Sequence, residues 1–363
     1  MTPRSNLPAR GTDSTPQHRS RGAIILLYHR VIELSGDPQR LCVHPRNFRR
    51  HLEILRREFR PISLRELCSC HSMGSVPDRA VAVTFDDGYA DNARIAVPML
   101  QEFDIPATIF VTTGNIGSVR EFWWDALERI LLRTPRLPAS LSLKVGGQRH
   151  TWRLDDGSAD RPCEPSWHVE SDPPLTKRQG LYRLLCRVLR DMHARKQNDV
   201  LTALFRWARV SPAAPATHRA MTIELLRRVS REGLIEIGSH TMTHPVLSKQ
   251  PPRQQYEEIA ASGERLSRII GRPVTSFAYP YGCTRDFSRQ TIDLVRSAGY
   301  LRAFANTGRS PDASARITAD SPRFALPRAI VRDWDAPTFA RHLHRAFRDS
   351  TRIESPQHAT AGA

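Results

Sequence analysis

Three short polar clusters carry the side chains from which this chain could build a reactive site. The first is Thr84-Phe85-Asp86-Asp87-Gly88, in which two adjacent carboxylates follow an apolar run. Because adjacent residues leave a strand in different directions, one carboxylate can bind a cation while the other faces a substrate. The simpler alternative is an Asp-Gly turn that caps a helix.

The second cluster, Gly238-Ser239-His240-Thr241-Met242-Thr243-His244-Pro245, contains two histidines four residues apart. At this spacing both side chains share one face of a helical turn and can reach one metal ion. Such a pair also occurs by chance on solvated helices. Here it follows an apolar strand and a glycine, and α/β folds place their active sites at such strand ends.

The third cluster is the aromatic turn Phe277-Ala278-Tyr279-Pro280-Tyr281-Gly282. A turn of this kind can aim a backbone N–H into a cleft as an oxyanion donor, although by itself it could equally be a hydrophobic strand cap. One carboxylate and two histidines are a common open zinc site that leaves a position for water. Such a metal lowers the pKa of water to about 7, and a second carboxylate can take the proton. The three clusters together predict metal-assisted hydrolysis.

The elements that must position these clusters alternate along the chain, which predicts an α/β domain with a largely parallel sheet. Expected strands cover Ala23–Tyr28, Val81–Phe85, Ile105–Val111, Leu234–Ile237, Val274–Tyr279 and residues 300–305. One expected helix carries Phe48, Leu52, Leu55 and Phe59 on one face. A second begins at the cap Thr222 and stops at Gly233. Further helices are expected over residues 254–270, 287–298 and 337–347.

Residues 118–220 interrupt this alternation. They begin with a helix that contains Trp123 and Trp124, continue as polar, proline-containing sequence over 136–180, and end in a second helical segment around 181–207. We interpret them as an insertion into one domain that spans residues 23–349. The segments 1–22 and 350–363, rich in Ser, Thr, Pro, Arg and Ala, are predicted to be flexible tails.

Composition narrows the class of protein. The chain has 54 Lys and Arg against 37 Asp and Glu, a net charge of +17, but its arginines are scattered and not interleaved with aromatic residues. This disfavours nucleic-acid binding. The six cysteines form neither a disulfide framework nor zinc-finger spacing, which predicts free thiols. Without a signal-peptide h-region or a run of 18 apolar residues, the chain is expected to be cytoplasmic.

In residues 23–117 and 222–347 the sequence resembles the polysaccharide deacetylase group (NodB homology, carbohydrate esterase family 4). The run Val81–Tyr89 resembles its TFDDG motif, Gly238–His244 its H-[ST]-x-x-H motif, and Tyr279–Gly282 its third motif. The resemblance implies a distorted (β/α) barrel and a divalent metal, usually zinc. It also implies that Asp86 is the catalytic base, that Asp87, His240 and His244 are metal ligands, and that the Tyr281 N–H serves the oxyanion.

Two positions depart from the group's pattern. The arginine that many members carry at the start of the third motif is replaced by Ala278, so something else must orient the base. The comparable C-terminal stretch, Leu326–Val331, lacks the histidine of the usual Leu-x-His motif. The segment Leu26–Val31 resembles a branch in which that element comes first, which predicts His29 as the general acid. Its alternative is a core histidine at a strand end.

The resemblance implies an acetylated glycan or a lipid-linked saccharide as substrate, with Tyr279, Pro280 and Trp124 predicted to contact it. The basic charge would also suit peripheral binding to an anionic membrane. Fold and motifs leave two alternatives open: a hydrolase of a non-sugar amide or O-acetyl ester, and an inactive glycan-binding barrel. The Trp123–Trp124 pair favours a sugar, but such pairs are often core packing.

Overall fold

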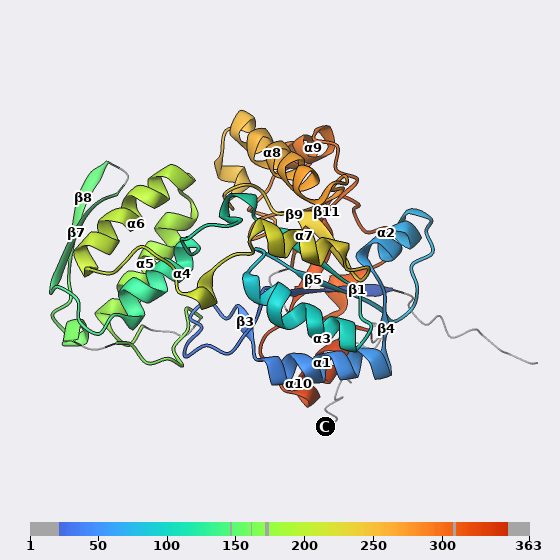
Figure 1. The fold of residues 1–363 in the computed structure, drawn as a ribbon, viewed down its shortest axis with the longest axis horizontal. Helices are drawn as coiled ribbons and strands as arrows, with labels where there is room; N and C mark the ends of the chain where they lie inside the picture. Colours follow the sequence, from blue (N-terminus) through green and yellow to red (C-terminus); the bar gives the residue numbers. More distant parts are fainter. Residues whose placement is uncertain (1–21, 146, 161, 171–173, 308–309, 348–363) are drawn as a thin grey trace, which may run out of the picture.

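The computed structural model describes residues 22–347 apart from 146, 161, 171–173 and 308–309. The two predicted tails therefore lie outside the described residues, except for Gly22. Within the described residues the chain forms a barrel of strands and helices, from which a smaller lobe projects (Figure 1).

Seven parallel strands close the barrel, and they follow one another around it in chain order. They are β1 (Ala23–Tyr28), β5 (Ala80–Phe85), β6 (Ala107–Val111), β9 (Ile235–Ser239), β10 (Ser276–Ala278), β11 (Arg302–Asn306) and β13 (Leu326–Ile330). The first strand closes the ring, because β1 pairs with β5 on one side and with β13 on the other. The predicted distorted (β/α) barrel is confirmed.

Short strands extend the barrel at its margins. The antiparallel β12 (Arg316–Ile317) pairs with β1, and β4 (Arg60–Pro61) pairs with β5. In contrast, β2 (Arg30–Val31) and β3 (Cys42–Val43) pair with each other in a separate two-stranded sheet. The sequence pattern did not predict these two-residue strands, because so short a run has no visible period.

The helices pack around the barrel and bury their apolar faces against it. They are α1 (Pro45–Glu58), α2 (Leu64–Ser72), α3 (Val97–Glu102), α7 (Ile223–Arg231), α8 (Pro252–Ile270), α9 (Arg289–Ser297) and α10 (Ala336–Ala346). Thr222 caps α7 as predicted, although the helix ends at Arg231 rather than at Gly233. Among the described residues, every helix is too short or too polar to span a membrane.

The interior of the barrel is filled by side chains, among them Phe110 and Phe304, whose ring centroids lie 5.4 Å apart. Gly238 makes room for the first ring, since a Cβ at this position would lie 2.3 Å from Phe110. Ala278 belongs to the same apolar cluster. All six cysteines are free, as predicted.

Residues 118–220 form the projecting lobe. It contains α4 (Trp123–Leu127), a π-helical turn (Glu128–Arg133), the hairpin β7 (Ser140–Val145) and β8 (Gln148–Arg153), α5 (Lys177–Arg190) and α6 (Ala194–Ala208). The lobe has an apolar cluster of its own, built around α4, α5 and α6. Its two ends lie side by side, because the Gly117 amide donates to the Met221 carbonyl at 3.0 Å.

Within the lobe, the structure differs from the sequence pattern at two points. The polar stretch 136–180 contains the hairpin β7–β8, whose second strand is mostly exposed and therefore shows no apolar alternation. The helical segment expected around 181–207 is two helices, which separate at His193, the cap of α6.

Candidate active site

The carboxyl ends of the seven barrel strands meet at one end of the barrel, and the predicted site residues follow them directly. His29 comes after β1, Asp86 after β5 and His240 after β9. A pocket of about 600 Å³ opens there, and its lining includes Asp87, His244 and Tyr281 as well. Closure of the barrel thus brings three sequence-distant clusters together.

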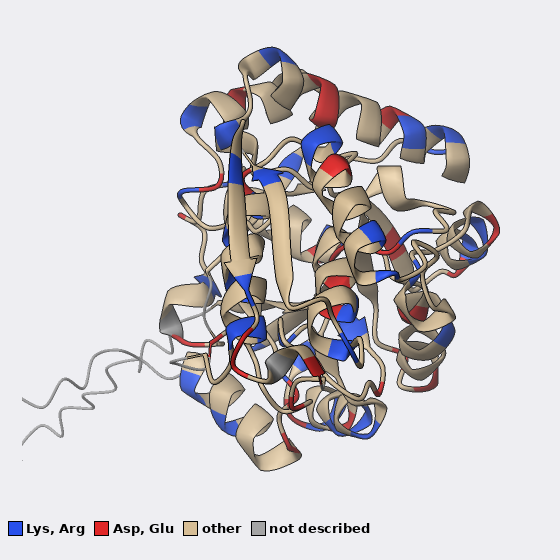
Figure 2. Ribbon diagram, turned by 90° about the vertical axis from the view of Figure 1, so that its left-hand side faces the viewer, with Lys and Arg blue, Asp and Glu red and all other residues tan. Residues whose placement is uncertain are grey.

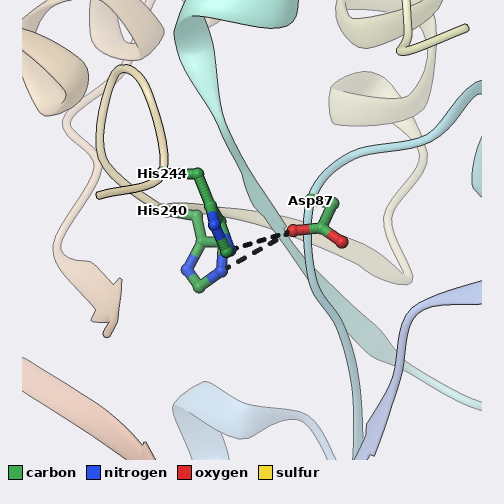
Figure 3. A group of neighbouring side chains, drawn as sticks. All are labelled: Asp87, His240 and His244. Atoms are coloured by element: carbon green, nitrogen blue, oxygen red, sulfur yellow. Dashed lines mark ion pairs between the residues drawn. The ribbon is translucent and has the colours of Figure 1, made fainter. Parts of the chain in front are cut away.

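Asp87, His240 and His244 form one buried group (Figure 3). The Oδ1 atom of Asp87 lies 3.4 Å from Nε2 of His244 and 3.8 Å from Nε2 of His240. All three ligand atoms lie within 4.8 Å of one another. The set of one carboxylate and two imidazoles is that of an open, zinc-type site.

Three observations show that these residues fit a divalent cation. The buried Oδ1 atom of Asp87 has no hydrogen-bond partner among the described residues, which is costly unless a cation compensates it. His240 Nδ1 lies 2.8 Å from the Ala278 carbonyl, a contact that directs Nε2 toward Asp87 as an acceptor. Burial lowers the pKa of His240. Burial and the neighbouring His240 lower the pKa of His244. Both rings are therefore in the neutral form that binds metals.

The loop that carries the two histidines is fastened from two sides. Glu258 of α8 accepts hydrogen bonds from the backbone amides of Met242 and Thr243 at 2.9 and 2.8 Å. Backbone amides of Thr113 and Gly114 donate to the carbonyls of residues 241 and 242 at 3.0 and 2.7 Å. The expected helical turn over residues 240–244 is wrong: the segment is an irregular loop, and the imidazoles converge because these bonds fold it back.

Left-handed backbone conformations are concentrated at this end of the barrel. Asp87, Thr241, His244 and Tyr281 all have positive φ angles, of 70°, 64°, 60° and 60°. For side chains with a Cβ, and most of all for the β-branched threonine, this conformation costs about 1–3 kcal/mol per residue. The orientation of two candidate ligands, Asp87 and His244, is therefore obtained at a cost in folding stability.

Asp86, the predicted base, is held by an arginine that the motifs did not reveal. Arg328 of β13 is fully buried and donates to both carboxylate oxygens, from Nη1 to Oδ1 at 2.6 Å and from Nη2 to Oδ2 at 2.7 Å. Burial alone would raise the pKa of Asp86, but the charge of Arg328 and the hydrogen bonds from it outweigh this effect and lower the pKa to about 2. Asp86 is therefore ionised at neutral pH, as a base must be.

Arg328 also explains the departure at Ala278. The two residues lie on different strands, β13 and β10, and the guanidinium of Arg328 lies 5.2 Å from the Phe110 ring centroid inside the barrel. The orienting group that was missing from the third motif thus comes from the C-terminal stretch that lacked a histidine. Its signal in the sequence was a single arginine within an otherwise apolar strand, Leu326–Ile330.

His29 lies beside Asp86 at the ends of two paired strands. Tyr28 is paired with Phe85, and the Asp86 amide donates to the Tyr28 carbonyl at 3.0 Å, so the next residue of each strand enters the same pocket. Burial lowers the pKa of His29 to about 4, and Arg332 and Arg328 oppose its protonation while Asp86 favours it. In this state of the site the imidazole is neutral at pH 7.

The third cluster contributes its last residue to the pocket. The Tyr281 ring lies 4.7 Å from the His244 ring, and the Tyr281 amide donates no hydrogen bond to another described residue. Tyr279 and Pro280 do not line the pocket: the Tyr279 ring stacks on Phe287 in the main apolar cluster, and its hydroxyl donates to the Phe324 carbonyl. These two residues, predicted to contact the substrate, therefore support the turn from outside the pocket. Tyr279 points outward because side chains alternate along a strand.

Trp124 lines the pocket but is only 5% exposed, because other rings cover it. Phe122 stacks on it at 4.7 Å, and the His244 ring lies 5.0 Å away at a steep angle. Its indole N–H donates to the Tyr89 hydroxyl, which donates to Asp125, both at 2.8 Å. This chain of hydrogen bonds connects the lobe to the candidate metal site.

Asp125 makes stability depend on pH. Burial raises its pKa from the usual value of 3.8 to about 8. Between these two pH values the folded protein therefore holds a proton that the unfolded chain has lost. Stability contributed by this group therefore falls as the pH rises from about 4 to about 8. We expect Asp125→Asn, which keeps an acceptor for Tyr89, to remove roughly 2 kcal/mol of the stability loss between pH 6 and pH 9. Urea unfolding of both proteins at the two pH values would measure this, and parallel pH profiles would contradict it.

Asp125, Glu128 and His218 form a second group whose ligand atoms lie within 4.8 Å of one another. Its carboxyl groups do not need a cation: Asp125 keeps its proton up to about pH 8 and accepts a hydrogen bond from Tyr89, and Arg133 pairs with Glu128 at 2.9 Å. The group therefore supports the lobe and does not have the exposed or uncompensated ligands of an ion site.

Several pocket residues were not predicted at all, because each lies in a segment without a motif. Arginines 183, 187 and 190 come from α5 of the lobe, Asn306 is the last residue of β11, and Arg332 and Gln39 come from loops around the barrel mouth. Nothing in a single sequence distinguishes these arginines from the many others on the surface. Figure 2 shows how widely Lys and Arg are spread over the helices, with acidic residues between them.

Comparison with known families decides which kind of protein this is. The sequence profile of the polysaccharide deacetylase family matches residues 73–133 and 199–303, which include Asp86, Asp87, His240 and His244. The chain belongs to the polysaccharide deacetylase family. The lobe falls largely between the two matched segments of this family.

Two curated relatives show the range of similarity within the polysaccharide deacetylases. The putative polysaccharide deacetylase YxkH of Bacillus subtilis is 33% identical over 95 residues, which are 26% of this chain and 33% of the relative. The poly-beta-1,6-N-acetyl-D-glucosamine N-deacetylase of Staphylococcus epidermidis is 29% identical over 132 residues, which are 32% of this chain and 46% of the relative. The matches thus span less than half of either relative.

A solved structure supports the family's fold over nearly the whole chain. The Streptococcus pyogenes deacetylase PplD, determined in complex with acetate, superposes with a TM-score of 0.53 at 16% identity. The superposition covers 89% of this chain and 98% of that one. At this identity the likeness concerns the barrel architecture alone.

Proposed function

We propose that this protein is a metal-dependent deacetylase that hydrolyses N-acetyl groups on a polysaccharide or glycan precursor. The observation that carries the proposal is that Asp86, clamped by Arg328, lies in one pocket with the candidate ligands Asp87, His240 and His244. Membership of the polysaccharide deacetylase family supports the glycan substrate, as do relatives named for N-acetylglucosamine polymers.

Each residue has a defined task in the proposed reaction. When bound by the three ligands, a divalent cation such as zinc would polarise the acetyl carbonyl and make water more acidic. Asp86 accepts the proton of the attacking water, and the carbonyl carbon becomes tetrahedral. The free amide of Tyr281 donates to the oxyanion that develops on the former carbonyl oxygen. Arg328 keeps both oxygens of Asp86 in a fixed orientation throughout.

Departure of the amine requires a proton at the sugar nitrogen, and His29 is positioned to carry it. The imidazole and Asp86 leave adjacent strands into the same pocket, so a proton accepted from water at one has a short path to the other. The low pKa of His29 makes it a strong acid once protonated.

We expect His29→Ala to lower kcat for acetate release by about 10²–10⁴-fold, the usual contribution of a general acid, without loss of metal. His51, which is buried in α1 and bonded to Tyr28 and Trp334, offers a matched histidine outside the pocket. Metal content should be the same for the wild type, His29→Ala and the control His51→Ala, and kcat should fall only for His29→Ala. Near-wild-type turnover of His29→Ala with metal bound would remove this residue from the mechanism.

Acetate release tests the proposed function directly. The purified chain, loaded with zinc, cobalt or manganese, is supplied with acetylated chito-oligosaccharides, small N-acetyl amides and O-acetyl esters. Release from the oligosaccharides and not from small amides supports the proposal. Preference for esters or small amides would support the alternative hydrolase. Tight glycan binding without any acetate release would support an inactive glycan-binding barrel.

The place of the substrate in the cell is part of the proposal. We infer that the glycan precursor is held at the cytoplasmic face of a membrane, with the positive charge of the chain favouring contact with anionic lipid. Binding to anionic vesicles that weakens steeply with salt would support this, and binding that is indifferent to salt would contradict it.

A further inference from the structure

One wall of the pocket is made of arginines from the inserted lobe. Residues 183, 187 and 190 of α5 all line the pocket and, at spacings of four and three residues, lie on one side of the helix. The other side of α5 buries Tyr182, Leu185 and Leu189 in the apolar cluster of the lobe. The lobe thus fixes this helix with its arginines toward the candidate metal site.

Stability does not explain the position of Arg187. Like charges three and four residues apart on a helix repel one another. Arg187 is exposed and has no ion-pair partner among the described residues, although acidic residues are plentiful elsewhere on the surface. Arg190 pairs with the buried Asp286 at 2.6 Å, and its guanidinium covers the Tyr281 ring at 4.3 Å from the centroid. A positive group is therefore held next to the proposed oxyanion donor.

The loop after β13 adds a further arginine to the pocket. Arg332 pairs with Glu170 at 2.9 Å, but Arg40 binds the same carboxylate, so one negative charge serves two arginines. Beyond Arg332 the pocket meets a second hollow of about 390 Å³, which Arg345 and Trp334 help to line. A ligand that extends from the metal site into this second hollow would remain in contact with arginines, here Arg332 and Arg345.

We propose that the substrate is an anionic saccharide, carrying a carboxylate or phosphate that lies against the arginines of α5 while the acetamido group occupies the metal site. The proposal rests on the proposed function and names its substrate class. Arginine suits this task, because its planar donor fork binds both kinds of oxyanion and never loses its charge. A neutral polymer of N-acetylglucosamine would leave Arg187 without a counter-charge.

The test compares three substrates of the zinc-loaded full chain by kcat/KM for acetate release. They are neutral chitotetraose, an oligosaccharide that alternates N-acetylglucosamine with glucuronate, and N-acetylglucosamine linked through pyrophosphate to a short alkyl chain. We expect at least one charged substrate to exceed the neutral one by about tenfold at low salt and by less at high salt. The better of the two identifies the source of the charge.

Substitutions in the lobe test whether Arg187 causes the preference for charged substrates. Arg187→Gln should lower kcat/KM for the charged substrate by about fivefold, mainly through KM, and leave the neutral one unchanged. Arg187→Lys should restore part of the loss. Arg206→Gln, at an exposed position of α6 outside the pocket, serves as the matched control and should change neither. Equal rates for neutral and charged substrates, or equal effects of the substitutions at 187 and 206, would overturn the proposal.

A binding measurement separates this inference from the proposed function. If none of the three substrates releases acetate, the deacetylase proposal fails, and calorimetry with the acetyl-free probes trigalacturonate and maltotriose decides the inference alone. Tighter binding of the charged probe that is weakened by Arg187→Gln supports an anionic ligand. Equal binding of the two probes overturns it.

Discussion

Replacing Asp87 with asparagine should abolish metal retention and reduce acetate release by about a thousandfold or more. The expected size follows from the several kcal/mol that a metal ion contributes to stabilising developing charge, at about tenfold in rate for each 1.4 kcal/mol. Asparagine keeps the shape of the side chain but removes the charge that faces the two imidazoles. Metal analysis after dialysis, together with initial rates of acetate release, measures both effects.

Stability provides the control for Asp87→Asn. In the metal-free protein the pKa of Asp87 is raised far above its usual value by burial and by the adjacent Asp86, so its charge is unfavourable there. The variant should therefore unfold at the same temperature as the metal-free wild type or at a higher one, and it should not be stabilised by added zinc. A variant that keeps stoichiometric metal and full activity would remove Asp87 from the ligand set.

Arg328→Gln should be the most damaging substitution outside the candidate ligands. It leaves the buried carboxylate of Asp86 without its two charged donors, and breaking a buried pair in this way costs about 3–5 kcal/mol of stability. It also frees the base to rotate, which should lower kcat by about a hundredfold. Chemical unfolding and steady-state kinetics measure the two consequences separately.

A pH profile distinguishes orientation of the base from a purely structural role of Arg328. With the guanidinium present, the pKa of Asp86 is about 2. Without it, burial dominates and the pKa rises, so the acidic limb of the kcat/KM profile should move to higher pH in Arg328→Gln. Arg328→Lys keeps the charge but not the paired hydrogen bonds, and should restore the acidic limb more than kcat. Unmoved profiles in both variants would show that Arg328 acts only on stability.

The parts of the fold that the sequence predicted are those with local signals. The strand Ala23–Tyr28 is predicted to the residue, since six apolar residues in a row are bounded by polar ones. The motif clusters after β5 and β9 are predicted equally well, because parallel strands in a barrel bring their carboxyl ends together. Because β1 pairs with β13, the segment Leu26–Val31, which predicted His29, lies beside the C-terminal stretch that lacks the usual histidine.

Long-range pairings account for what could not be predicted. Arg328 and Asp86 are 242 residues apart in the chain, and neither has a neighbour in sequence that indicates the other. The aromatic turn was predicted as a unit, but strand alternation alone would put Tyr279 and Tyr281 on the same side. They face different ways because Tyr281 has a positive φ angle of 60° in the turn after β10, which the sequence does not reveal. The arginines of α5 have no local signal either, because their position depends on how the lobe folds back over the barrel mouth.

The joined ends of the inserted lobe have a consequence for how such proteins diversify. Since the Gly117 amide binds the Met221 carbonyl, and the Met221 amide binds the Gly88 carbonyl, the barrel is already closed at the point where the lobe departs. A lobe of another size or sequence could be exchanged here without moving β5, β6 or β9, which carry the hydrolytic residues. Evolution can therefore change what is recognised while the bond-breaking machinery stays the same.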